Sequence, residues 1–350
     1  MREVVGNVIV GARPAGPRLL KDHLLVQASA GDVGDAAALA DRAGSGVVVS
    51  GEGALEAADR LNQTGLAWLV DRRRYAGRGR VPGTATFDGR WLARQRDRGA
   101  ALVLSDSGYI GQHDAASLRC VLSQAAAASS NVTAVLPLHA DWFSTDLLVL
   151  QEEIVRFGVP VAIVLEHARD PLSVRKTLLG FTQLLTVPVP VGLLSSDVSA
   201  LGALAFGAAW AAVGVRSSLR HLYPVKDKGG GRTSPLPSAL VDPALALIKV
   251  DKIAAGWAAS QDDPAWVCDC TVCGGRTLDW MLAASPMEAN AHTFERLLNR
   301  RDRLTSLMSG QDRRRSWRAQ CRSAEFQYQA LALVGVPWEV PGFLRYWQEA

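Results

Sequence analysis

The sequence has no apolar run long enough to cross a bilayer, and its first residues lack the apolar stretch of a signal peptide. It also lacks a glycine-rich phosphate loop, because residues 27–32, which follow the first apolar run, fit neither G-x-G-x-x-G nor a P-loop. Cysteine is scarce, with five among 350 residues. These absences predict a soluble, cytoplasmic protein without a membrane partner, and they disfavour a dinucleotide-binding fold.

The remaining composition is that of a globular protein. Hydrophobic residues make up 48% of the chain and charged residues 21%, a balance that excludes disorder and supplies a large core. A chain of 350 residues is long enough for one large domain with an appendage, or for two domains.

Eight short apolar runs alternate with alanine- and leucine-rich amphipathic segments. Runs of this length between helical segments are typical of buried parallel strands in βα units. Eight of them predict an α/β fold, a (β/α)₈ TIM-like barrel, with a doubly wound open sheet as the alternative. The runs occupy residues 23–28, 46–50, 66–70, 101–105, 133–138, 160–165, 187–194 and 211–215.

Three of the five cysteines lie close together as Cys268, Cys270 and Cys273, and His292 is the next histidine along the chain. Three thiolates and one imidazole form a closed tetrahedral donor set, which is typical of a structural Zn²⁺ site. Disulfide pairing is the alternative, but such close neighbours pair poorly and a third cysteine would be left over. We therefore expect Zn²⁺ as the cofactor.

Composition also suggests where the barrel ends. Residues 226–235 are rich in glycine and lysine, as in a loop or linker. We expect the barrel at residues 1–225, a linker at 226–242 and a zinc-binding helical subdomain at 243–350. Helical material is predicted from about 243 to 260, and again through His292 and the arginines that follow.

A predicted barrel followed by Cys-x-Cys-x-x-Cys and a histidine resembles the tRNA-guanine transglycosylases and their DNA-modifying relatives. The segment Ser105-Asp-Ser-Gly-Tyr109 is similar to that family's T-D-S-G-G-F motif. The resemblance implies exchange of a base for a 7-deazaguanine, with Asp106 contributing to catalysis at the base and Asp141 recognising it. The family's nucleophilic aspartate aligns with Ala212 or a neighbouring apolar residue, so the resemblance does not extend to the full catalytic set.

Polar residues collect just after the predicted strands, where a barrel places its active face. Asp170 and Asp197 also look like helix caps. Because the family nucleophile is unmatched, another carboxylate has to hold the sugar if exchange occurs. The candidate catalytic residues are Asp106, Asp141 and Asp197, and the candidate substrate-binding residues are Ser107, Gly108, Tyr109, Glu166, His167, Arg216 and Arg220.

Arginines concentrate between residues 296 and 322, opposed there only by Asp302 and Asp312. A surplus of this kind beside a metal site suggests a phosphate-contacting surface, and a solvated helix face is the alternative. The candidate contacts to RNA or DNA are Arg300, Arg301, Arg313, Arg314, Arg315 and Arg318.

Three functions remain open from the sequence. The first is a transglycosylase-like enzyme that exchanges or releases a base in nucleic acid. The second is a catalytically inactive, zinc-bearing subunit that binds nucleic acid or a partner chain, as a homodimer or with a different protein. The third is an unrelated barrel enzyme that acts on a small molecule.

Overall fold

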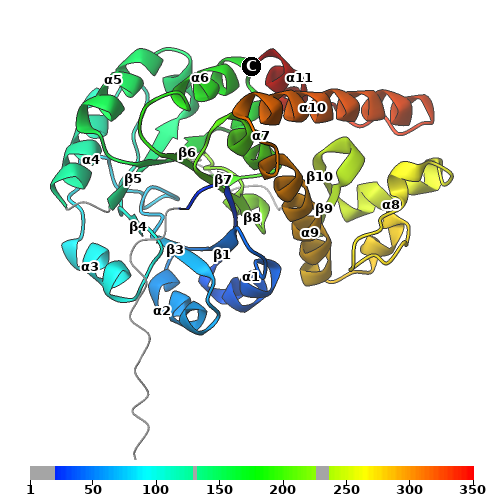
Figure 1. Cartoon of the computed structure of the whole chain (residues 1–350), viewed down its shortest axis with the longest axis horizontal. Coiled ribbons are helices and arrows are strands. Elements are labelled where there is room, and N and C mark those ends of the chain that lie inside the picture. Colours follow the sequence, from blue (N-terminus) through cyan, green and yellow to red (C-terminus); the bar gives the residue numbers. More distant parts are fainter. Residues whose placement is uncertain (1–19, 129–131, 226–235) are drawn as a thin grey trace, which may run out of the picture.

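The computed structural model describes residues 20–128, 132–225 and 236–350. Eight strands form the centre of the larger part of the molecule, and seven helices surround them (Figure 1). The strands are β1 (His23–Ser29), β2 (Ser45–Ser50), β3 (Ala67–Asp71), β4 (Val103–Leu104), β5 (Val132–His139), β6 (Val161–Glu166), β7 (Val191–Ser196) and β8 (Trp210–Gly214). The helices are α1 (Val33–Leu39), α2 (Ala54–Ala58), α3 (Gly89–Asp97), α4 (Ala115–Ala127), α5 (Leu147–Phe157), α6 (Arg175–Leu184) and α7 (Ser199–Phe206).

All eight strands are parallel and belong to one sheet, in the order β3-β2-β1-β8-β7-β6-β5-β4. The two end strands come together, because the amide of Ala101, just before β4, donates a 2.9 Å hydrogen bond to the carbonyl of Trp68 in β3. The sheet is therefore a nearly closed barrel. The predicted TIM-like (β/α)₈ fold is confirmed, and each of the eight predicted apolar runs overlaps one strand.

The strands are apolar because both of their faces are buried. Residues that point outward pack under the surrounding helices, and residues that point inward form a separate core inside the barrel. This double burial explains why each strand reads as a continuous apolar run rather than as an alternating one. The inner core includes Leu25, Val48, Leu69, Val135, Ala162, Leu194 and Ala212.

The barrel is irregular where β7 ends. Ladder pairing between β6 and β7 stops at Leu193, and Ser195 adopts a left-handed φ of 52°. A segment after β8 takes the vacated position beside β6. There the amide of Leu222 donates to the carbonyl of Leu165, and the amide of His167 donates to the carbonyl of Leu222, both at 3.0 Å. Residues after β8 thus lie across the carboxyl end of β6.

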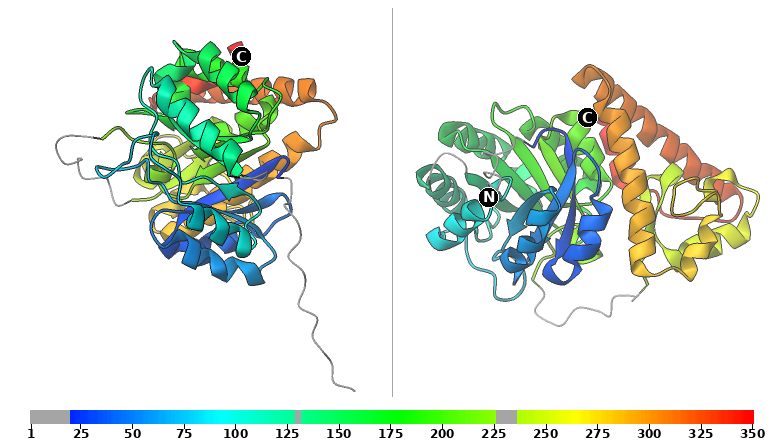
Figure 2. Two further views of the ribbon diagram at one scale, coloured as in Figure 1. Left: turned by 90° about the vertical axis from the view of Figure 1, so that its left-hand side faces the viewer. Right: turned by 60° about the horizontal axis from the view of Figure 1, so that its bottom comes forward.

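The carboxyl-terminal region contains a β-hairpin and four helices beside the barrel (Figure 2). Aromatic side chains join the last two helices to α7: Trp347 packs on Phe206 at 4.9 Å between ring centroids and on Trp317 at 6.4 Å. The elements are β9 (Ser238–Val241), β10 (Ala246–Lys249), α8 (Val250–Ala259), α9 (Pro286–Thr305), α10 (Gly310–Leu333) and α11 (Gly342–Glu349).

The hairpin corrects the predicted boundaries in this region. Residues 238–241 were expected in a linker and 246–249 in a helix, but they pair as antiparallel strands. Pro243 and a left-handed Leu245, with φ of 49°, form the turn between them, and the helix begins only at Val250. Residues 226–235 of the linker predicted at 226–242 lie outside the described residues. Within the described ranges, no helix is both long and apolar enough to span a membrane.

Candidate metal centre and barrel mouth

Cys268, Cys270, Cys273 and His292 come together as the sequence predicted. Their ligand atoms all lie within 4.8 Å of one another, and all four side chains are buried. The Nδ1 atom of His292 is 3.5, 3.4 and 3.3 Å from the three sulfurs in that order. Three sulfurs and one nitrogen in this arrangement form a closed site that could bind a metal ion.

The loop around the cysteines is shaped by tight turns. The amide of Gly274 donates to the carbonyl of Cys270 at 2.8 Å, and that of Gly275 donates to the carbonyl of Cys268 at 2.9 Å. Gly274 and Gly275 have φ values of 59° and 85°, a left-handed conformation that glycine adopts at little cost. The Cys273 amide also points at the sulfur of Cys270, at 3.3 Å. The knuckle thus directs its three sulfurs to one point.

His292 is oriented by the hairpin. Its Nε2–H donates to the carbonyl of Leu240 in β9 at 2.8 Å, which leaves the Nδ1 lone pair directed at the sulfurs. The hydroxyl of Thr293, the next residue, accepts a 3.1 Å hydrogen bond from the amide of Leu240. The hairpin that the sequence analysis missed therefore holds the only imidazole of the cluster in place.

The thiols fit a dication chemically. The hydrogen bond from Cys273 lowers the pKa of Cys268 to about 4, and the same bond raises the pKa of Cys273 well above its ordinary value. Cys268 is therefore the thiol that ionises most readily, and a bound dication would favour ionisation of Cys270 and Cys273 as well. All five cysteines are free, so the disulfide alternative is not what the structure contains.

Asp106 follows β4 at the carboxyl end of the barrel, called here the barrel mouth. Its side chain is fully buried. The carboxylate accepts from Arg74 at 2.7 Å, from Arg72 at 3.1 Å and from the backbone amide of Asp88 at 3.1 Å. Because protein donors surround the carboxylate, Asp106 cannot reach a substrate atom in this arrangement.

Glu166, at the end of β6, is engaged in a similar way. Arg80 donates to one of its carboxylate oxygens at 2.5 Å, and the hydroxyl of Tyr109 donates to the other. The Cζ atom of Arg80 lies over the Tyr109 ring, 3.7 Å from its centroid. Burial and the hydrogen bond to Glu166 hold the pKa of Tyr109 well above its usual range.

The neighbours of Tyr109 have packing roles. The hydroxyls of Ser105 and Ser107 are 2.7 Å apart, and that of Ser105 accepts the amide of Val135 in β5. A Cβ on Gly108 would lie 2.0 Å from the carbonyl oxygen of Pro82, so a larger residue cannot occupy this position. The segment that resembles the family motif is therefore fixed against both β5 and the β3–α3 connection.

Asp170 and Asp197 cap short turns, as predicted, and they also influence each other. Asp170 accepts the amide of Leu172 at 3.0 Å, and Asp197 accepts that of Ser199 at 2.9 Å. Burial, together with the charge of Asp197, raises the pKa of Asp170 to about 7. Burial raises the pKa of Asp197 as well, although Arg220, held by a 3.1 Å hydrogen bond to the carbonyl of Gly214, opposes that shift. The pair could hold a proton near neutral pH.

The other predicted rim residues lie farther out. Asp141 is half exposed and accepts from Gln112 at 2.6 Å. Arg216 is mostly exposed and pairs with Asp32 at 2.6 Å. The Nδ1 atom of His167 is 3.0 Å from the carbonyl oxygen of Arg169. None of these residues shares a hydrogen bond with Asp106 in the described part of the chain.

Ala212 points into the inner core of the barrel and is completely buried. It pairs with Leu25 of β1, below the end of β8. The position that aligns with the family nucleophile is therefore an apolar core position. Across the mouth, Asp71 is buried as well and accepts the Tyr75 hydroxyl at 2.5 Å. Burial raises the pKa of Asp71, so this carboxyl group ionises less readily and is less suited to act as a nucleophile.

The predicted phosphate-contacting arginines mostly join the helices to other parts of the protein. Arg301 donates to the carbonyl of Ala43, and Arg313 pairs with Asp22 at 2.8 Å. Arg300 pairs with Asp242 at 2.6 Å, and Arg318 donates to the carbonyl of Ala350 at 2.8 Å. Arg315 pairs with Asp312 at 3.5 Å and is largely exposed, and Arg314 is half-buried. Four of the six, Arg300, Arg301, Arg313 and Arg318, thus bind parts of the protein outside their own helix.

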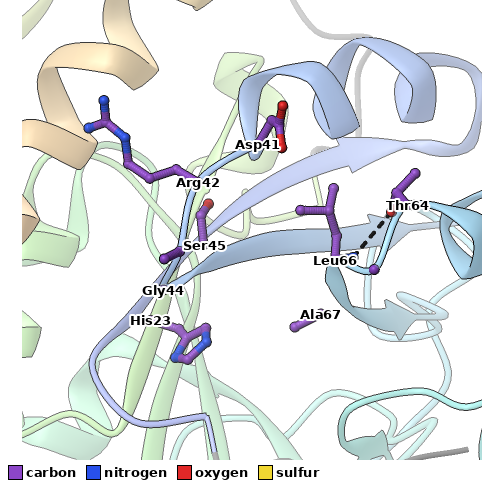
Figure 3. A pocket seen from close by; sticks show the side chains of 10 residues that line it. His23, Asp41, Arg42, Gly44, Ser45, Thr64, Leu66 and Ala67 are labelled. Carbon is purple, nitrogen blue, oxygen red and sulfur yellow. Dashed lines mark hydrogen bonds between the residues drawn. The ribbon is translucent and has the colours of Figure 1, made fainter.

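Sequence reasoning missed the partners of the mouth acids. These partners are Arg72 and Arg74 for Asp106 and Arg80 for Glu166. A hollow of about 460 Å³ was also not expected; it lies at the opposite, amino-terminal end of β1–β3 (Figure 3). Its lining includes His23, Asp41, Arg42, Ser45 and Thr64. It is far in the fold from the residues that the motifs indicate.

Comparisons with known proteins add no family to this geometry. No family model, curated protein or solved structure matches the chain.

Proposed function

We propose that this protein is a zinc-bearing, transglycosylase-like barrel that binds nucleic acid without exchanging a base. The observation that carries the proposal is that the barrel mouth has no free carboxylate at the two positions that the family resemblance indicates. Asp106 is saturated by two arginines and a backbone amide, and the nucleophile position is Ala212 in the core. Base exchange needs a carboxylate free to hold the sugar, and these two positions do not supply one.

The metal in this proposal is Zn²⁺. Soft thiolates with a single imidazole and no open position suit structural zinc better than a catalytic metal. The site needs reduced thiols, which supports a cytoplasmic location. A role in stabilising the hairpin and α9, rather than in chemistry, follows from the complete ligand set and its burial.

Contacts to nucleic acid are proposed on the rim of the mouth instead of on α9 and α10. Arg78 and Arg169 are exposed there, and neither has an ion pair within the described ranges. Arg216 is also largely exposed beside its partner Asp32. Cations on one rim attract phosphates in a salt-dependent way. These exposed arginines support RNA or DNA as the partner. A second protein chain is the alternative partner for the same surface.

The test is binding of labelled single-stranded RNA and DNA at several salt concentrations, followed by fluorescence anisotropy. Binding is expected to weaken as salt rises, and the double variant R78A/R169A is expected to lower the slope of log K against log salt by about one to two. Arg60→Ala removes an equally exposed charge at the other end of the barrel and should leave the slope unchanged.

A second measurement separates binding from chemistry. Protein at high concentration is incubated with RNA or DNA and labelled guanine, and incorporation of the label is followed. We expect none. Incorporation above the level of a heat-denatured sample would show that the protein exchanges bases, and a salt-independent or absent interaction with nucleic acid would reject the binding role.

A further inference from the structure

The hollow at the amino-terminal end of β1–β3 has no part in the proposed function. It lies between the start of β1, the loop that joins α1 to β2, and the turn before β3 (Figure 3). Its volume of about 460 Å³ is in the range of small-molecule sites in proteins, about 300–1,000 Å³. The barrel mouth is at the opposite end of the strands, so a ligand in this hollow would be separate from the mouth.

One wall of the hollow, the α1–β2 loop, is fixed by α9. The Arg42 side chain extends away from the hollow toward α9 (Figure 3), where it donates to Asn299 at 2.6 Å. Arg301 donates to the carbonyl of Ala43 at 2.5 Å. A Cβ on Gly44 would lie 2.0 Å from Nη1 of Arg301, so the loop and the arginine are in close contact. The hollow is therefore preformed where the barrel meets the carboxyl-terminal region, a common place for ligand sites.

The side-chain donors of the lining are engaged within the protein. The Ser45 hydroxyl donates to the carbonyl of Leu24 at 2.9 Å, and the Thr64 hydroxyl donates to the carbonyl of Leu61 at 2.7 Å. The guanidinium of Arg42 is held by α9. These groups are therefore poorly placed to donate to a ligand that carries negative charge.

Two acceptors of the lining are free. Nδ1 of His23 lies 2.9 Å from the carbonyl oxygen of Lys21, which can only accept, so in the neutral imidazole Nε2 presents a lone pair. Neither this Nε2 nor the Asp41 carboxylate has a hydrogen bond or ion pair within the described ranges. Figure 3 places the two residues on opposite sides of the hollow, with Leu66 and Ala67 also in the lining. Such a lining suits a cation with N–H donors at both ends and an apolar body between them.

An organic cation fits this hollow better than a metal ion. In the part of the chain that the structure describes, the one group of three or more His, Cys, Asp or Glu side chains that could hold a metal ion is the cysteine cluster. We propose that the hollow binds a short organic diammonium ion. One ammonium group pairs with Asp41, the other donates to Nε2 of His23, and the alkyl chain lies against Leu66 and Ala67.

The experiment titrates the four-carbon diamine putrescine into the full chain by calorimetry, with butanediol and succinate as ligands of equal length. Putrescine is expected to bind saturably and to raise the melting temperature, because it binds only the folded chain, whereas the neutral diol and the dianion are not. Asp41→Asn is expected to weaken binding at least about tenfold, and His23→Phe about three- to tenfold. Asp35→Asn is the matched control, because it neutralises an exposed carboxylate on α1 outside the lining and should bind as the wild type.

The controls separate a defined site from general attraction of cations. The absence of saturable putrescine binding, or equal binding of butanediol, would overturn the proposal. Tighter binding of succinate would show that the hollow recognises an anion instead. An equal loss in D35N and D41N would mean that surface charge alone holds the diamine, and would reject the site. Nucleic acid is proposed to bind at the opposite end of the barrel, so either result leaves that proposal to its own test.

Discussion

Replacing Asp106 with asparagine distinguishes a structural carboxylate from a catalytic one. The side chain is 0% exposed and lies between Arg74 and Arg72, which are 25% and 38% exposed. Asparagine keeps an oxygen for the amide of Asp88 but removes the negative charge between two cations. Breaking a buried ion pair in this way costs about 3–5 kcal/mol. Because both arginines can reach water, we expect D106N to lose about 2–3 kcal/mol.

The corresponding change in melting temperature follows from the size of the chain. An unfolding entropy of about 2.1 cal/mol/K per residue gives roughly 0.7 kcal/mol/K for 350 residues. A loss of about 3 kcal/mol therefore lowers the melting temperature by about 4 °C if the chain unfolds as one unit. The assay is thermal and urea unfolding followed by circular dichroism, with metal content held constant.

The control is Asp141→Asn, which changes an equivalent side chain at a half-exposed position. That variant should stay within about 0.5 kcal/mol of the wild type. Catalytic residues are often maintained at some cost to stability, so removing one commonly leaves stability unchanged or raises it. Unchanged or increased stability in D106N would refute the structural interpretation of this carboxylate.

Two further predictions concern the metal and the buried acid pair. Purified protein should contain about one zinc per chain, and Cys270→Ser should lose it and melt at a lower temperature; metal analysis showing no bound ion, or unchanged melting, would contradict this. The pKa of Asp170, raised to about 7, means that its stabilising contribution is present below pH 4 and lost as pH rises through 7. Asp170→Asn keeps the cap and should be more stable than the wild type at pH 8 but similar at pH 4, by urea unfolding; the opposite order would contradict the shift.

The barrel was predictable because its strands are buried on both sides. Each strand appears in the sequence as an apolar run, and even β4, only two residues long, lies inside a run at 101–105. The hairpin at 238–249 was not predictable by the same pattern, since an alanine- and leucine-rich segment also fits a helix. What decides its structure is tertiary: the backbone of Leu240 bonds both His292 and Thr293 on α9.

The metal cluster could be predicted from the sequence, whereas the charge pairs at the barrel mouth could not. Four ligands of matching type with short spacing almost define a site, because few other arrangements use three neighbouring thiols. The charge pairs at the mouth depend on the path of the β3–α3 connection, which brings Arg72, Arg74 and Arg80 over acids that come from β4 and β6. The sequence indicated the two acids, Asp106 and Glu166, but it could not show that arginines from this connection neutralise them.

The pairing of the mouth carboxylates with arginines is physically related to the apolar residue at Ala212. An isolated carboxylate in a water-poor barrel mouth is costly unless it is paired, protonated or facing a ligand. An enzyme of this fold leaves such groups facing its substrate. Here Asp106 and Glu166 each meet an arginine from one connection, and Asp170 shifts its pKa instead. With an apolar residue at the position that resembles the family nucleophile, the charges of Asp106 and Glu166 are balanced by arginines of the same chain rather than directed at a substrate.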